Sequence, residues 1–140
     1  MILYLDTSAL VKRYFAESFS QQVIDKWNES EVIVTSSVAY SETMSTIYRK
    51  QKDENLDDEV VQDIVGLFQT DWKSFIRVDV ADHLNALIDR LVHAYFLRGF
   101  DTVHLASALI VHDRLSQHFF FACFDQRLNQ AARFEGLATF

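Results

Sequence analysis

The feature that most constrains this chain is the alternation of short apolar runs with longer stretches of helical periodicity. Apolar runs of strand length occupy residues 2–5, 32–35, 76–80 and 118–124. Between them, apolar residues recur at helical spacing, most regularly over residues 84–95. Strands that alternate with helices form mainly parallel sheets covered by helices. The pattern therefore predicts a single α/β domain over residues 1–140, with the last residues as a candidate edge strand.

Small polar residues and glycines mark where several helices are expected to begin or end. Thr7 and Ser8 offer hydroxyl caps for the first helix. Gly99 is expected just beyond the C-terminal end of the helix over residues 84–95. Asp101 is then expected to open a helix that is apolar around most of its circumference. Such a helix should lie at the centre of the molecule.

Composition excludes several other classes of protein. The 140 residues are 49% apolar, with no proline and only three glycines, which argues against a collagen, a flexible linker, a turn-rich β-sandwich or a disordered chain. The single cysteine, Cys123, lies in an apolar run and is interpreted as a buried thiol in a reducing compartment. No segment has the features of a signal peptide or the length of a membrane span. We therefore expect a cytoplasmic protein with no membrane partner.

The charge balance is acidic. Thirteen Lys and Arg residues stand against twenty Asp and Glu residues, for a net charge of −7. Proteins that grip duplex DNA through a broad surface are usually basic, so broad duplex binding is not expected. An acidic balance is compatible with an enzyme whose carboxylates hold a metal ion that in turn binds phosphate.

Four carboxylates are expected to converge at one edge of the sheet. Asp6 and Asp125 each follow an apolar strand directly. Glu42 lies about a turn and a half into the helix after the second strand, and Asp101 lies at the start of the central helix. Parallel strands end at a common edge, and the helices that follow them start there, which is where α/β proteins bind ligands. Taken singly, Asp101 could be only a helix cap and Asp125 only a turn residue.

Convergent carboxylates repel one another unless a cation lies between them. Sites with only oxygen ligands suit Mg²⁺ or Mn²⁺, which retain several waters and also bind phosphate oxygens. Such ions lower the pKa of water and stabilise a leaving oxygen. The four acids therefore predict a divalent metal site that acts on phosphate esters.

Four segments, in order along the chain, resemble those of the PIN-domain ribonucleases. They are residues 3–12 (LYLDTSALVK), residues 35–42 (TSSVAYSE), residues 97–108 (LRGFDTVHLASA) and residues 124–128 (FDQRL), the last followed by paired alanines and Gly136-Leu137. The resemblance covers essentially the whole chain. The compact length is similar to that of the VapC-type toxins of toxin–antitoxin pairs.

The resemblance implies a function, a site and a more specific fold. The function is an Mg²⁺- or Mn²⁺-dependent endoribonuclease that acts as the toxin of such a pair, with RNA as substrate, a cognate antitoxin as partner and a homodimer as the assembly. The catalytic and metal-binding acids would be Asp6, Glu42, Asp101 and Asp125, with Thr7 as a secondary polar residue of the site. The fold would be the three-layer PIN arrangement, a mainly parallel five-stranded sheet flanked by helices.

Three arginines lie close in sequence to these acids. Arg13, Arg98 and Arg127 are the candidates for contacts with RNA phosphates.

Other functions are left open by the sequence. The chain could be a catalytically silent PIN-like module that binds RNA or protein. It could also be an aspartyl-phosphate hydrolase with Asp6 as nucleophile, although Ser8 stands where such phosphatases carry a second acid. His104, three residues after Asp101, could bind a transition metal, but a lone histidine in an apolar helix is more often packed and hydrogen-bonded.

Overall fold

A four-stranded parallel sheet forms the middle layer of the structure, a computed structural model that describes residues 1–115 and 117–140. The strands are β1 (Ile2–Leu5), β2 (Val32–Ser36), β3 (Ile76–Val78) and β4 (Phe119–Ala122). Their spatial order is β3-β2-β1-β4, with Leu3 opposite both Ile33 and Phe120. All four predicted strands are present, and β3 and β4 are shorter than their apolar runs. The predicted α/β class is confirmed.

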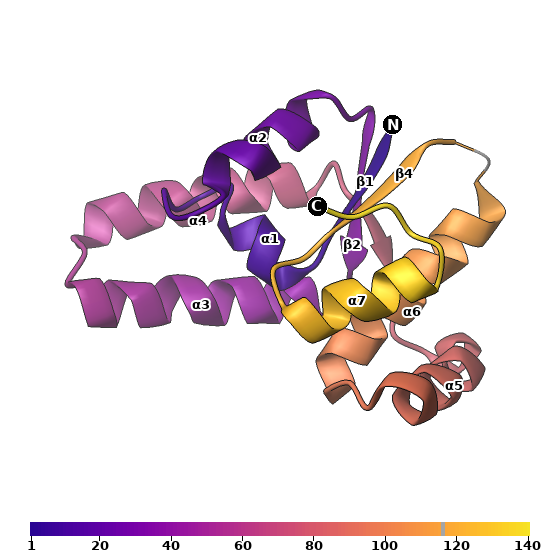
Figure 1. Ribbon diagram of the computed structural model, residues 1–140. Helices are drawn as coiled ribbons and strands as arrows, with labels where there is room; N and C mark the ends of the chain where they lie inside the picture. The colour runs from indigo at the N-terminus through magenta and orange to yellow at the C-terminus, as the bar shows by residue number, and fades with distance from the viewer. Residues whose placement is uncertain (116) are drawn as a thin grey trace.

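Helices cover both faces of this sheet. They are α1 (Thr7–Val11), α2 (Ser20–Asn28), α3 (Ala39–Glu54), α4 (Asp58–Trp72), the 3-10 turn η1 (Asp82–Leu84), α5 (Asn85–Tyr95), α6 (Gly99–Arg114) and α7 (Gln126–Phe134). In Figure 1, α1 to α4 lie on one side of the strands and α5 to α7 on the other. The chain therefore has three layers, helices on sheet on helices.

The pleat of the strands divides the core between these two faces. Leu3 and Leu5 belong to the cluster on the side of α1–α4, whereas Ile2 and Tyr4 belong to the cluster on the side of α5–α7. Helix α6 is buried at every position from Thr102 to Leu109. Its central placement, predicted from its apolar circumference, is confirmed.

The expectation of a fifth strand is wrong, because the sheet formed by the described residues has four strands. The tail makes only one bridge to the sheet, Ala138 opposite Phe120, with a hydrogen bond of 2.8 Å from the Phe121 amide to the Ala138 carbonyl. Beyond it, the Arg133 side chain of α7 donates to Thr139 Oγ1 over 2.7 Å and to the Phe140 carbonyl. These contacts with α7 hold the tail, so its backbone does not continue along β4.

Two helix boundaries also differ from the sequence expectation. The helix over residues 85–95 ends with Phe96 as its left-handed C-cap (φ 52°), and Gly99 begins α6 instead of closing α5. Buried Leu97 anchors the short turn between the two helices. At α1 the cap is Asp6, whose carboxylate accepts the Ala9 amide, and not Thr7 or Ser8. Among the described residues, none of the helices combines the length and apolarity needed to cross a membrane.

Candidate functional site

The four predicted acids lie at the carboxyl-terminal edge of the sheet. Asp6 directly follows β1 and caps α1, and Asp125 follows β4 and caps α7. Glu42 lies in the first turn of α3, earlier in that helix than expected, and Asp101 lies in the first turn of α6. The parallel topology thus brings together residues that are up to 119 positions apart in the sequence.

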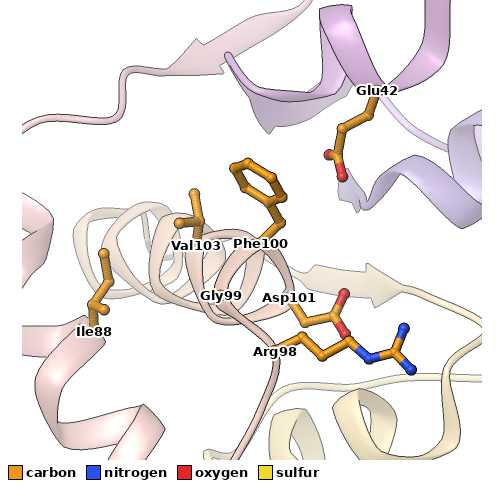
Figure 2. A pocket seen from close by; sticks show the side chains of 7 residues that line it. All are labelled: Glu42, Ile88, Arg98, Gly99, Phe100, Asp101 and Val103. Atoms are coloured by element: carbon orange, nitrogen blue, oxygen red, sulfur yellow. The ribbon is translucent and has the colours of Figure 1, made fainter. Parts of the chain in front are cut away.

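Two cavities join three of these acids, Glu42, Asp101 and Asp125. Glu42 and Asp101 line a cavity of about 710 Å³, and Figure 2 shows their side chains extending into it from α3 and α6. Asp101 also lines a neighbouring cavity of about 290 Å³ together with Asp125. Asp101 is therefore common to both cavities.

Asp6 is the buried member of the group, with 4% of its surface exposed. Its Oδ1 accepts the Ala9 amide at 2.9 Å and the Ser8 hydroxyl at 2.7 Å. Burial raises the pKa of Asp6 to about 6, because these hydrogen bonds and the nearby His104 only partly offset the lost hydration, and the charge of Asp101 raises it further. Ionised Asp6 therefore lowers the free energy of unfolding. A buried carboxylate with such a raised pKa is typical of a functional site, here one that suits a cation.

Glu42 is fixed by two donors on the same oxygen. Its Oε1 accepts the Thr7 hydroxyl at 2.7 Å and pairs with His104 Nε2 at 2.9 Å. Partial burial alone would raise the pKa of Glu42, but the hydrogen bonds from His104 and Thr7 and attraction to His104 outweigh it and lower the pKa. Glu42 therefore remains ionised with one oxygen oriented by neighbours.

Asp101 and Asp125 interact through their charges. Partial burial raises the pKa of Asp101, and repulsion from Asp125 raises it further, while His104 and Arg98 act in the opposite direction. Asp125 is exposed, and its Oδ1 accepts the Leu128 amide at 2.9 Å as the cap of α7. Asp125 is thus a helix cap, where the sequence had suggested a turn residue as its structural role, and it also lines a cavity together with Asp101.

The three arginines singled out from sequence are placed differently. Arg98 and Arg127 line the cavity of Asp101 and Asp125. Arg13 instead lies 3.9 Å from Asp71 of α4 and places its guanidinium over the Trp27 ring, 5.1 Å from the centroid. Arg13 is therefore engaged in packing between helices and is not brought to these cavities.

His104 is packed and hydrogen-bonded, as expected for a lone histidine in an apolar helix. It is 2% exposed, and its Nδ1 lies 2.9 Å from the Tyr4 hydroxyl. Both of its ring nitrogens thus have partners among the site residues.

The donor set is compatible with a water-rich divalent ion. Within residues 1–115 and 117–140, no three His, Cys, Asp or Glu side chains form a group that could hold a metal by themselves. Mg²⁺, however, binds proteins through one or two carboxylates and keeps waters and phosphate oxygens in its other positions. Asp6 and Glu42 each use one carboxylate oxygen for the bonds described above. Their second oxygens accept no hydrogen bond from the described residues.

Sequence reasoning missed Tyr4 and Phe100 as members of this site. Tyr4 is a tyrosine in the middle of a fully buried strand, and a buried hydroxyl needs a partner, so its pairing with a polar residue could have been anticipated. Phe100 precedes Asp101 and is 61% exposed at the mouth of the cavity drawn in Figure 2. No periodic pattern in the sequence distinguishes this exposed phenylalanine beside Asp101.

Fold and site together define a three-layer α/β protein with four carboxylates along the carboxyl edge of a parallel sheet. The PIN domain family model matches residues 3–133. The chain is 30% identical over 139 residues to ribonucleases VapC45 and VapC49 from two strains of Mycobacterium tuberculosis, covering 96% of this chain and 92% of each relative. The chain belongs to the PIN domain family, among its VapC-type ribonucleases.

A solved structure shares the fold. The chain superposes on a chain from the crystal structure of VapBC2 from Rickettsia felis bound to a DNA fragment from the VapBC2 promoter, with a TM-score of 0.66 and 13% identity. The alignment covers 100% of this chain and 98% of that one. At this identity the likeness supports the arrangement of helices and strands.

Proposed function

We propose that residues 1–140 form one domain that acts as a divalent-metal-dependent endoribonuclease, the toxin of a toxin–antitoxin pair. The observation that carries the proposal is the meeting of Asp6, Glu42, Asp101 and Asp125 at one edge of the sheet in a chain of the VapC type. Asp6 and Asp101 would hold the metal most directly, with Glu42 and Asp125 completing its surroundings. Mg²⁺ or Mn²⁺ suits these oxygen ligands.

The chain's own residues account for substrate placement. Arg98 and Arg127 border the acidic cavity and would hold the backbone phosphates on either side of the scissile one. Exposed Phe100 offers a face on which a base can stack, which suits a single-stranded RNA. Thr7 supports the site through its hydrogen bond to Glu42.

The reaction is hydrolysis of a phosphodiester. Water attacks phosphorus in line, the bond from phosphorus to the 3′ oxygen breaks, and the products carry a 5′-phosphate and a 3′-hydroxyl. A bound divalent ion would lower the pKa of the attacking water and offset the charge of the phosphate. The carboxylates fix the site of attack, and the arginines restrain the strand.

The test is a ribonuclease assay on the purified chain with Mg²⁺, with Mn²⁺ and with a chelator. Wild type is compared with Asp6→Asn and with Asp63→Asn, an equivalent change at an exposed position of α4. We expect metal-dependent cleavage by wild type and Asp63→Asn and its loss in Asp6→Asn. Equal cleavage by all three proteins would show that the activity does not belong to this site.

The partner assignments have their own test. We propose that the chain binds a cognate antitoxin and forms a homodimer, and Phe96 and Phe134, 77% and 80% exposed, are apolar surface available to such contacts. Induction should arrest growth with wild type and not with Asp6→Asn, and co-expression of the neighbouring small gene should relieve the arrest. Light scattering of the purified chain reports the dimer. Arrest by both proteins would contradict a catalytic toxin.

A further inference from the structure

We propose that His104 is a positioning residue for Glu42, held in one tautomer by Tyr4, so that one oxygen of Glu42 is immobilised and the other is left for the cleft. The role of this arrangement in metal binding and cleavage rests on the proposed function. The arrangement itself rests on hydrogen bonds within the protein.

The direction of the hydrogen-bond chain follows from the groups involved. An ionised carboxylate can only accept, so His104 Nε2, 2.9 Å from Glu42 Oε1, must carry the proton. In a neutral imidazole Nδ1 is then an acceptor. With His104 in this neutral state, the Tyr4 hydroxyl, 2.9 Å away, is the donor to Nδ1. Tyr4 thus selects the His104 tautomer that can hold Glu42.

Because Tyr4 and His104 are buried, water cannot readily take the place of the hydrogen bonds between them. Tyr4 is 0% exposed and His104 2% exposed, beneath the partly exposed Glu42. Buried polar groups that lose a partner are left unsatisfied, which favours the one complete arrangement over alternatives. The two rings also pack edge to face at 80°, with centroids 5.9 Å apart, which fixes the plane of the imidazole.

The consequence for Glu42 is a restricted carboxylate. The Thr7 hydroxyl donates to the same Oε1 from α1, so residues of two other helices, α1 and α6, hold this oxygen. A long side chain tied at one oxygen has few rotamers left, and Oε2 is the atom available to a cation or a water. Groups that orient ligands in this way commonly affect metal affinity or activity by about 10- to 100-fold when removed.

Two substitutions at position 104 distinguish the effect of losing the N–H donor of His104 from the effect of losing the packing of its ring. His104→Leu fills the space without a donor, and His104→Gln keeps an N–H near the place of Nε2. We expect His104→Leu to weaken Mn²⁺ binding and lower kcat by about 10- to 100-fold. His104→Gln should lose clearly less than His104→Leu.

A pair of matched tyrosine substitutions tests the tautomer. Tyr4→Phe removes the hydroxyl and keeps the ring. Tyr14→Phe removes a hydroxyl bonded at 2.8 Å to Asp71, away from the site. We expect Tyr4→Phe to weaken Mn²⁺ binding by about 5-fold, the worth of one neutral hydrogen bond, and Tyr14→Phe to leave it unchanged.

The measurements are Mn²⁺ titration calorimetry of the apo protein, kinetic constants on RNA, and long-range proton–nitrogen NMR of the histidines, with His104 assigned by its loss in His104→Gln. Wild type should show the Nε2–H tautomer, and Tyr4→Phe should show a mixture. An Nδ1–H tautomer, or wild-type Mn²⁺ affinity in a folded His104→Leu, would overturn the proposal. Mn²⁺ binding without RNA cleavage by wild type would refute only the proposed function, since the affinities still decide the role of His104.

Discussion

Replacing Asp6 with asparagine should stabilise the metal-free protein at neutral pH. The Asp6 carboxylate is buried, and its pKa is raised from 3.8 to about 6. Between about pH 4 and pH 6 the native state therefore holds a proton that the unfolded state has lost. Stability falls as pH rises through that window, and the loss persists at higher pH.

The magnitude follows from the size of the shift. About two pKa units correspond to about 3 kcal/mol of unfolding free energy above pH 6. Asparagine is as good a helix cap as aspartate, and its Oδ1 can accept the same Ala9 amide and Ser8 hydroxyl. Asp6→Asn should therefore gain up to about 3 kcal/mol at pH 7.5 and little at pH 4.

The assay is urea unfolding of both proteins in chelator at about pH 4 and pH 7.5. Asp125→Asn is the matched control, because it changes another helix cap whose carboxylate is exposed, and it should shift stability little at either pH. Added Mn²⁺ should reverse the order at pH 7.5, since an ion at about 1,000 times its Kd stabilises only the protein that binds it, by about 4.1 kcal/mol. An Asp6→Asn protein less stable than wild type at pH 7.5, or a difference independent of pH, would refute the reasoning.

Three further outcomes are expected. Arg98→Ala should weaken RNA binding uniformly across sequences and reduce the slope of log affinity against log salt by about 0.7, measured by fluorescence anisotropy; an unchanged slope would remove Arg98 from the phosphate contacts. Phe68→Ala, which empties a fully buried position among aromatic rings, should cost about 3–5 kcal/mol by urea unfolding, whereas Phe134→Ala at an 80% exposed position should cost little. Gly136→Ala should cost about 1 kcal/mol because φ there is 90°, and a neutral result would contradict that conformation.

Local sequence patterns predicted most of the fold. Four strands, the central helix and the meeting of four acids follow from periodicity and from the geometry of parallel sheets, in which every strand ends at the same edge. The same reasoning failed at Gly99, because Phe96 adopts the left-handed cap conformation that glycine usually takes. It also failed at the tail, where the Arg133 side chain donates hydrogen bonds to Thr139 and to the Phe140 carbonyl and the chain does not add a strand to the sheet.

The finer design of the site was decided by tertiary structure. Periodicity and caps are properties of neighbouring residues, and they sufficed for the α/β class and for the edge at which Asp6, Glu42, Asp101 and Asp125 lie. The hydrogen bonds from His104 to Glu42 and from Tyr4 to His104 span 62 and 100 residues, so no local pattern contains them. Packing likewise removed water from Asp6 and drew Arg13 to Trp27. The burial of a side chain and the identity of its partners depend on which helices and strands pack together, and only the folded chain determines that.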